Sequence, residues 1–361
     1  MSERPIIGIT MGDPAGVGPE VTVKALARDE VWDCCRPLVV GDAGVLARAV
    51  ALVEASLLLH SVADVAEAHF DPAAPDVLDL HNVDPAALQP GKVSATAGRA
   101  AVEAVERAVE LAQAGQVDGI ATGPINKAAL QAAGIPYVGH TELLAALTGA
   151  ERVTTMLATP GLRVVHVTRH VPLREVAAHI TRERVLETIR LTDVGLKGLA
   201  LSDAEGPALS DAEGPALSSA EGPALSDVEG TGIPRPRLAV AALNPHGGDE
   251  GLLGREEIEA IGPAVEAARA EGIEAHGPIP ADSVFFRAIR GEFDAVVAMY
   301  HDQGHIPIKT HGFERSVTVT LGLPIVRTSV DHGTAFDIAW RGVANEESMV
   351  EAIRLAAQLA S

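Results

Sequence analysis

The sequence predicts an α/β protein in which helices cover a largely parallel sheet. Short apolar or β-branched runs alternate with helical patterns along the chain, as in sheets of this class. The chain has 361 residues, of which 47% are hydrophobic, so it is long and apolar enough to bury a sizeable core. That length also predicts roughly two domains, at about 150 residues each.

Strands are expected where β-branched runs end at turn residues. The expected strands are 6–10, 37–40, 117–122, 153–158, 163–168, 238–243, 294–299, 316–321 and 325–328.

Helices are expected where apolar residues recur every three or four positions. The clearest helix covers 94–114, because small apolar residues recur every fourth position from Ala97 to Val109 and Gly115 offers a C-terminal stop. The other expected helices are 19–28, 141–147, 182–196, 254–270 and 346–359.

Composition excludes several classes of function. The chain has 28 basic and 49 acidic residues, a net charge of -21, so it would repel nucleic acid and anionic membranes. No apolar run reaches the ~18 residues of a membrane helix, and no signal-peptide pattern opens the sequence. The only cysteines, Cys34 and Cys35, are adjacent, and neighbouring residues rarely form a disulfide. We therefore expect a cytoplasmic protein that binds small molecules.

A low-complexity segment interrupts the helical and strand patterns. The octet ALSDAEGP begins at Ala200 and recurs three times, the last two imperfectly, ending near Gly230. Acidic residues and Gly-Pro breakers fill it, and it holds no basic residue. We interpret 202–230 as an exposed acidic insertion.

Polar residues gather directly after expected strands. In open α/β sheets ligands bind beyond the carboxyl ends of strands, so we expect these loops to face one cleft. The loops are Gly123–Lys127, Arg169–His170, Asn244–Gly248 and Tyr300–Gly304.

Three of these loops each supply a histidine, namely His170, His246 and His301. Three imidazoles with an open position would bind a borderline divalent ion. Their spacing matches no local metal motif, so the fold would have to bring them together. The alternative is that they are ordinary surface or satisfied core histidines, because the chain has 13 histidines and most such residues have that role.

Other motifs also allow two interpretations. The loop 12–20 could hold an anion or form a tight turn, and its glycines do not match the dinucleotide fingerprint. His140 and Thr141 could bind an oxyanion or, for Thr141, cap a helix. Lys309 and Arg327 could bind phosphate or be solvated surface charges. Residues 331–339 form a Gly-containing loop with two carboxylates.

Taken together, the motifs resemble the 4-hydroxythreonine-4-phosphate dehydrogenase family of vitamin B6 synthesis over the whole chain except the acidic insertion. The motifs occur in the family's order: MGDPAGVGPE, TGPINK, GHTE, ALNPHGG, PADS, YHDQG and RTSVDHGTA.

The resemblance implies two α/β/α domains with an interdomain cleft, as in the isocitrate and isopropylmalate dehydrogenases, without a Rossmann fingerprint. We expect a cofactor-side domain at 1–135 plus 281–361 and a substrate and dimerisation domain at 136–280.

The resemblance also implies that His170, His246 and His301 bind one divalent ion, Zn, Mg or Co, in a site shared across a homodimer. The residues implied to hold the phosphorylated C4 hydroxy acid are His140, Thr141, Lys309 and Arg327.

The implied reaction is oxidation of the C3 hydroxyl of 4-hydroxy-L-threonine 4-phosphate to a β-keto acid. That acid would then decarboxylate to 3-amino-2-oxopropyl phosphate. NAD or NADP would bind at His332, Gly333 and Asp337. Asp282 and Asp302 fall in the family's active-site motifs. Lys127 is a candidate proton carrier or carboxylate ligand.

Two positions depart from the vitamin B6 enzymes. Thr318 stands where they usually have Asn, and Gly-His305-Ile-Pro-Ile-Lys replaces Gly-Leu-Pro. These changes resemble a branch that acts on D-threonate or D-erythronate 4-phosphate, which is the alternative function. A metal-dependent sugar-phosphate binding protein without redox activity is a second alternative.

Overall fold

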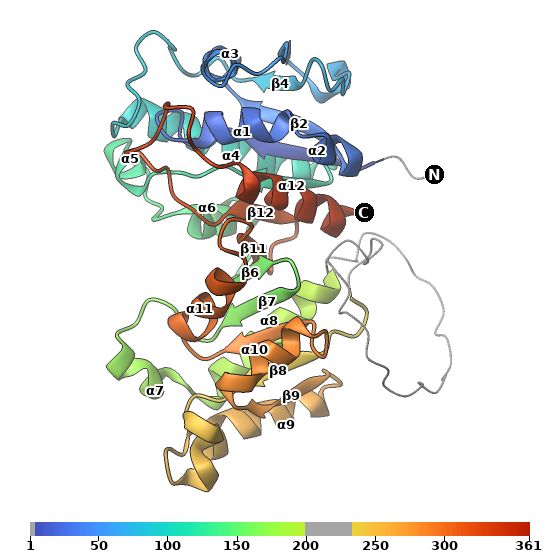
Figure 1. Ribbon diagram of the computed structural model, residues 1–361, viewed down its shortest axis with the longest axis vertical. Coiled ribbons are helices and arrows are strands. Elements are labelled where there is room, and N and C mark those ends of the chain that lie inside the picture. Colours follow the sequence, from blue (N-terminus) through green and yellow to red (C-terminus); the bar gives the residue numbers. More distant parts are fainter. Residues whose placement is uncertain (1–3, 199–232) are drawn as a thin grey trace. The chain divides into compact units, whose positions relative to one another are not determined.

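Figure 1 shows the computed structural model, which describes residues 4–198 and 233–361. The expected acidic insertion at 202–230 therefore lies outside the described residues. The chain divides into two compact units. Unit 1 holds the chain up to Thr159 and again from Lys309 to Ser361, and unit 2 holds Pro160–Ile308.

Unit 1 is built on a sheet in the order β3-β4-β2-β1-β5-β12-β11-β6. Its pairs are parallel except that β11 runs antiparallel to both β12 and β6. The strands are β1 (Ile6–Thr10), β2 (Arg36–Gly41), β3 (His60–Val62), β4 (Asp76–Asp79), β5 (Gly119–Thr122), β6 (Thr154–Thr159), β11 (Val317–Leu321) and β12 (Arg327–Val330).

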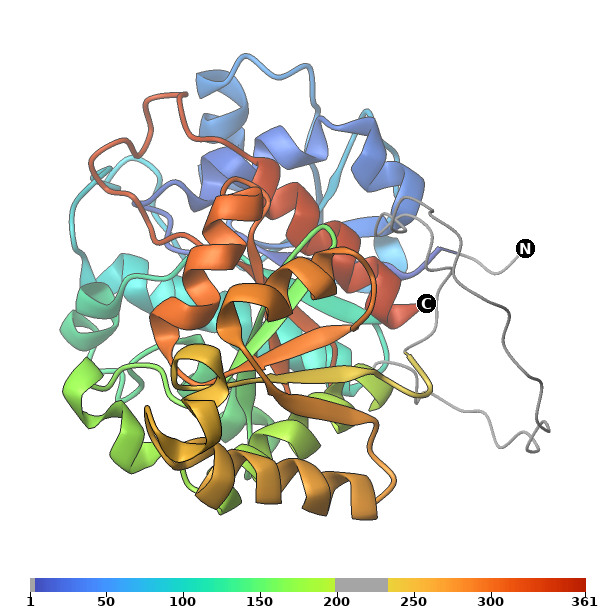
Figure 2. The same cartoon turned by 60° about the horizontal axis from the view of Figure 1, so that its bottom comes forward.

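Helices cover both faces of this sheet. The helices of unit 1 are α1 (Gly18–Leu26), α2 (Asp29–Cys34), α3 (Ala43–Leu52), the 3₁₀ helix η1 (Val65–Glu67), α4 (Ala95–Gln113), α5 (Lys127–Ala132), α6 (His140–Thr148) and α12 (Glu347–Ala360). The C-terminal α12 packs on β5 and β12 and against α1 and α2, and Figures 1 and 2 both show it, in red, beside these blue helices.

Helix α4 shows how sequence determines packing here. Ser94 caps its first turn by accepting a hydrogen bond from Ala97 N at 3.4 Å, and Gly115 follows its end with φ +66°. Its small residues let α5 approach closely, because a Cβ at Gly98 would lie 2.3 Å from the Ala129 carbonyl oxygen. The expected helix at 94–114 is thereby confirmed.

Unit 2 has a fully parallel sheet in the order β7-β10-β8-β9. Its strands are β7 (Leu162–His166), β8 (Leu238–Ala241), β9 (Ala275–Ile279) and β10 (Ala295–Ala298). Its helical segments are η2 (Leu173–Glu175), α7 (Val176–His179), α8 (Arg182–Gly198), the turn η4 (Pro245–Gly251), the π-helical turn η5 (Glu257–Ile261), α9 (Gly262–Ala270) and α10 (Ala281–Ile289). Helix α11 (His301–Gly312) begins in this unit and ends in unit 1.

The α/β class is confirmed, and three local expectations are corrected. Residues 300–304 do not form a loop, because His301 opens α11 directly after β10. The expected helix 254–270 begins only at Glu257 and starts with a π-helical turn. The short strands β3, β4 and β9 were not expected, since each is too short or too polar for a clear alternating pattern.

The chain passes between units in the β6–β7 turn and within α11, whereas the sequence places the limits at 135/136 and 280/281. Helix α6 explains part of this difference. Its Leu143 and Leu144 are fully buried in the apolar core that also holds Leu38, Val105 and Ile120. Burial of that face ties α6 to unit 1.

Within the described residues, no helix is both long and apolar enough to cross a membrane. Cys34 and Cys35 are both free thiols.

Candidate active site

The centre of the unit 1 sheet holds a buried cation. Arg327 opens β12, between β5 and β11, and its side chain is only 3% exposed. Its Nε and Nη2 donate to Thr122 Oγ1 at 3.1 and 2.6 Å, and its Nη1 donates to Thr320 Oγ1 at 2.9 Å. Burial lowers the pKa of Arg327 to about 9, so the guanidinium stays charged at neutral pH.

No carboxylate in the described part of the chain pairs with Arg327. A buried charge without a counterion is costly, so the surroundings of Arg327 suit an anionic ligand.

His140 lies close to this cation. It is the first residue of α6, and its Nε2 is buried without a hydrogen-bond partner among the described residues. Burial, and secondly the nearby Arg327, hold the pKa of His140 well below its usual range. A neutral imidazole can donate or accept one hydrogen bond to a ligand. Thr141 follows at the same helix N-terminus, which favours negative charge.

Lys309 lies elsewhere in unit 1, in an ion pair with Asp331, which directly follows β12. Ser316 Oγ donates to the same Asp331 oxygen at 2.6 Å, and the ring of Phe313 lies 4.9 Å from the Lys309 ammonium. Asp331 and Ser316 therefore hold Lys309 in place. Thr318 is in β11, in register with Ser329 of β12 and Leu157 of β6.

In unit 1, the loop at residues 12–20 is hydrogen-bonded to the loop at residues 331–340. Thr334 O accepts from Val17 N at 3.0 Å, and Pro14 O accepts from Trp340 Nε1 at 2.9 Å. A Cβ at Gly16 would lie 2.9 Å from Thr334. Gly16 therefore permits close packing against the 331–340 loop, which favours the tight-turn interpretation of residues 12–20.

The three residues expected to bind the cofactor lie in the 331–340 loop. His332, Gly333 and Asp337 are all exposed. Asn126 Nδ2 donates to Thr334 Oγ1 at 3.1 Å, which connects the loop to Lys127, the exposed first residue of α5. Sequence reasoning missed Asn126, although the motif Gly123–Lys127 contains it.

In the first loop, Asp13 carries a perturbed carboxyl group. Its Oδ1 accepts from Ala15 N at 2.9 Å, while its buried Oδ2 has no partner among the described residues. Burial raises the pKa of Asp13 to about 6.

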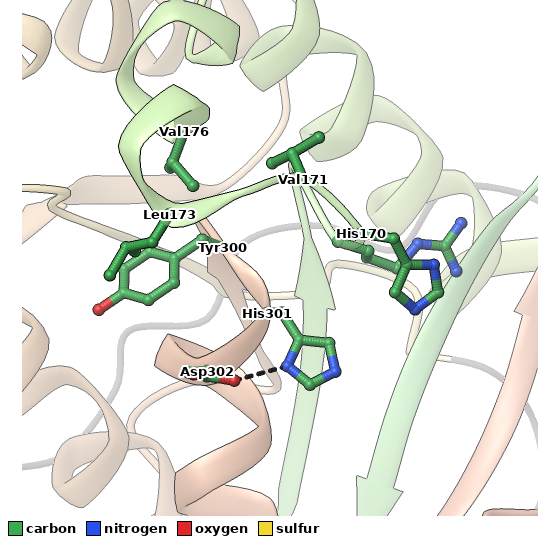
Figure 3. Close-up of a pocket in the computed structure, with 8 residues that line it drawn as sticks. His170, Val171, Leu173, Val176, Tyr300, His301 and Asp302 are labelled. Atoms are coloured by element: carbon green, nitrogen blue, oxygen red, sulfur yellow. Dashed lines mark hydrogen bonds and ion pairs between the residues drawn. The ribbon is translucent and has the colours of Figure 1, made fainter.

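In unit 2, a pocket of about 310 Å³ lies after β7 and at the start of α11 (Figure 3). Figure 3 shows His170 and His301 in this pocket, and their ring centroids are 6.1 Å apart. Asp302 Oδ1 lies 2.7 Å from His301 Nδ1. This pairing leaves the Nε2 of His301 for a ligand, as in many metal-binding histidines. The lining residues are Arg169, His170, Val171, Leu173, Val176, Tyr300, His301 and Asp302.

A stack of histidines backs His301. The ring of His305, one helical turn further on, lies parallel to that of His301 at 3.6 Å between centroids. His166 of β7 lies 4.7 Å from His305, and its buried Nε2 has no hydrogen-bond partner in the described chain. Burial, followed by the nearby His305 and His301, lowers the pKa of His166 to about 3. A Cβ at position 304 would lie 2.2 Å from His166 Nε2, so Gly304 is required there.

His246 lies in the turn η4, apart from the other two histidines. Across residues 4–198 and 233–361, no three His, Cys, Asp or Glu side chains gather closely enough to hold a metal ion. The structure thus brings His170 and His301 together in one pocket but not His246. Asp282 is an exposed residue in the first turn of α10, a helix that packs against η4.

Comparisons with known proteins agree on one family. Residues 33–205 and 224–356 match the family described as "Pyridoxal phosphate biosynthetic protein PdxA". A protein of Symbiobacterium thermophilum named "Putative D-threonate 4-phosphate dehydrogenase" is 48% identical, with 100% of this chain and 98% of that protein covered. A 4-hydroxythreonine-4-phosphate dehydrogenase of Desulforapulum autotrophicum is 46% identical, covering 98% and 95%. The crystal structure of a 4-hydroxythreonine-4-phosphate dehydrogenase from Klebsiella pneumoniae has a TM-score of 0.85 and 43% identity, covering 99% and 98%.

The buried cation predicts that an anion stabilises the protein. Phosphate at about ten to a hundred times its Kd should raise the free energy of unfolding by about 1–3 kcal/mol, because it binds the folded state. Arg327→Met should lose most of this gain, and without anions it should be at least as stable as wild type, since replacing a buried charge by a well-packed apolar group is often neutral or stabilising. Denaturant unfolding with and without phosphate measures both effects.

Arg237→Met is the matched control, because Arg237 pairs with Asp294. It should keep the phosphate response. Equal responses in wild type and Arg327→Met would contradict the assignment of an anion site.

Proposed function

The chain belongs to the pyridoxal phosphate biosynthetic protein PdxA family, and on that premise we propose that it is a metal-dependent, NAD(P)-linked dehydrogenase acting on 4-hydroxy-L-threonine 4-phosphate. The buried guanidinium of Arg327 supports this function most directly, because it lacks a carboxylate partner in the described chain and lies near the neutral ring of His140. This pair favours an anionic substrate group. A homodimer in the cytoplasm is part of the proposal, without nucleic acid or membrane partners.

The substrate supplies anionic groups at both ends. Arg327 offers charge-assisted hydrogen bonds, and His140 and Thr141 add donors at the N-terminus of α6. Lys309, held by Asp331 and Ser316, provides a second positive group. Together these four side chains bind the phosphorylated acid and orient its C3 hydroxyl.

The donor chemistry of the histidines fits a divalent ion. The pairing of His301 Nδ1 with Asp302 leaves Nε2 for coordination, and His170 lies in the same pocket. We assign His170, His246 and His301 as ligands, with His246 completing the site across the homodimer. Three imidazoles favour Zn²⁺ or Co²⁺ over Mg²⁺. When bound, such an ion supplies Lewis-acid polarisation of the C3 oxygen and of the later carbonyl.

The other proposed site residues bind the cofactor, transfer protons or orient a metal ligand. His332, Gly333 and Asp337 hold NAD or NADP, which supplies the hydride acceptor when bound. Lys127, at the end of the Gly123–Lys127 loop, would in its neutral form take the C3 hydroxyl proton and return one to C2 after carbon dioxide leaves. The β-keto acid thereby becomes 3-amino-2-oxopropyl phosphate. The alternative role of Lys127 is to bind the substrate carboxylate as an ammonium group. Asp302 orients His301. We place Asp282 at the same site because its helix, α10, packs against η4, which holds His246.

D-threonate or D-erythronate 4-phosphate is the second candidate substrate. The name of the 48% identical relative favours it, as do Thr318 and His305 at positions that differ from the vitamin B6 enzymes. These substrates keep the C3 hydroxyl and C4 phosphate, and a hydroxyl replaces the C2 amino group. A sugar-phosphate binding protein without redox activity remains a third candidate.

NADH formation, followed by absorbance, tests the proposal. Metal-loaded protein should reduce NAD or NADP with 4-hydroxy-L-threonine 4-phosphate, and the D-threonate and D-erythronate esters serve as comparison substrates. His246→Ala should lose activity by at least about a hundredfold, in line with loss of a metal ligand. If turnover is highest with a sugar-acid phosphate, the second candidate function replaces the first. Binding without reduction of either nucleotide would favour the third.

The two departing positions predict a shift in substrate preference. Thr318→Asn combined with His305→Leu should raise the ratio of kcat/KM for 4-hydroxy-L-threonine 4-phosphate over D-threonate 4-phosphate by about tenfold or more, the effect of about 1.4 kcal/mol in transition-state binding. Ser361→Ala, at the C-terminus, is a control that should leave the ratio unchanged. An unchanged ratio in the double variant would mean that neither side chain distinguishes an amino group from a hydroxyl at C2 of the substrate.

A further inference from the structure

The turn that presents His246 has an unusual backbone. Six consecutive residues, His246–Gly251, have positive φ, from 47° at Asp249 to 94° at Gly251. Residues other than glycine rarely adopt this conformation, and here three of the six are not glycine. Such a run persists only when surrounding contacts hold it.

The buried carboxylate of Glu257 provides those contacts. Its Oε1 accepts from Leu243 N at 2.8 Å and from Asn244 N at 2.7 Å. Its Oε2 accepts from Asn244 Nδ2 at 2.9 Å. One side chain thus takes three hydrogen bonds from the two residues where the chain leaves β8 and enters the turn. Glu257 is only 4% exposed, so these bonds are not shared with bulk solvent.

The glycines of the turn fit this carboxylate. A Cβ at Gly248 would lie 2.7 Å from Glu257 Oε2, and one at Gly254 would lie 2.2 Å from Asn244 Nδ2. Gly248 and Gly254 therefore allow the backbone to close over the Glu257–Asn244 pair. Glu256 adds a second acceptor for Asn244 Nδ2, at 2.7 Å.

A π-helical turn places Glu257 there. The turn covers Glu257–Ile261 and leads directly into α9. Such turns are rare and frequently occur at functional sites. Here the turn puts a carboxylate under a loop that begins thirteen residues earlier in the chain, at Asn244.

We infer that Glu257 is a positioning residue for His246. It fixes the backbone at Leu243 and Asn244, and so sets the direction in which the following left-handed turn presents the imidazole. This inference rests on the proposed function, in which His246 is a metal ligand. A carboxylate suits the task because it accepts hydrogen bonds at both oxygens and donates none.

The test uses the full chain with Co²⁺ as the probe. Glu257→Leu should weaken Co²⁺ binding by about tenfold to a hundredfold, the usual effect of removing a group that orients a metal ligand. It should also change the visible absorption of bound Co²⁺, which reports ligand geometry. Hydrogen–deuterium exchange of the segment 242–252 should accelerate, because two amides lose their acceptor.

Two further variants separate positioning from general damage. Glu257→Gln keeps a carbonyl acceptor, so it should fold if Glu257→Leu does not, and it should recover most of the Co²⁺ affinity. Glu259→Leu is the matched control, since Glu259 is exposed and pairs with Arg255. It should change neither the affinity nor the exchange.

Faster exchange in Glu257→Leu with unchanged Co²⁺ affinity and absorption would overturn the inference, since Glu257 would then be merely structural. Failure of the proposed function looks different. In that case wild type and His246→Ala would bind Co²⁺ equally, and the metal role of His246 and this inference would both be rejected, while the exchange result would still report the contacts of Glu257.

Discussion

The buried guanidinium of Arg327, which no carboxylate among residues 4–198 and 233–361 neutralises, is the constraint around which unit 1 is arranged. Its guanidinium lies where three strands meet, and hydroxyls of Thr122 on β5 and Thr320 on β11 take its hydrogen bonds. Hydroxyls can solvate a cation, but they do not neutralise it. The neutral ring of His140 adds no charge. Unit 1 therefore keeps an electrostatic cost in its core, and we propose that an anionic ligand removes it.

In unit 2, several contacts hold imidazole rings in fixed orientations. Asp302 pairs with His301, the ring of His305 lies parallel to it, and Glu257 fixes the chain before His246. Each of these contacts acts on a histidine from outside the proposed coordination sphere. Preorganisation of this kind is what a metal centre requires, because small errors in ligand direction reduce affinity. Gly304 and Gly248 have the same origin, since each leaves room for a buried side chain beside a proposed ligand.

Much of this could be predicted from sequence, where the signal is local. The four-residue spacing of small apolar residues from Ala97 to Val109 predicted α4, and strand ends followed by polar residues located Arg169–His170 and the turn at His246. The π-helical turn at Glu257 could not be predicted, because its purpose is a contact with Asn244. Helix α11 was missed since Gly304 and Pro307 suggest a loop, whereas packing against His166 requires Gly304. His166 itself looked like an ordinary strand residue. Long-range packing decided each of these cases.

In the reaction that we propose, oxidation at C3 is coupled to loss of the carboxyl group. The most direct test uses 4-hydroxy-L-threonine 4-phosphate, and in parallel D-threonate 4-phosphate, labelled with carbon-13 in the carboxyl group. Reduced nicotinamide and labelled bicarbonate are then quantified in the same reaction. Coupling of the two steps predicts equal amounts of the two products at every time point with the natural substrate. Reduced nicotinamide without labelled bicarbonate, or bicarbonate without reduction, would contradict it.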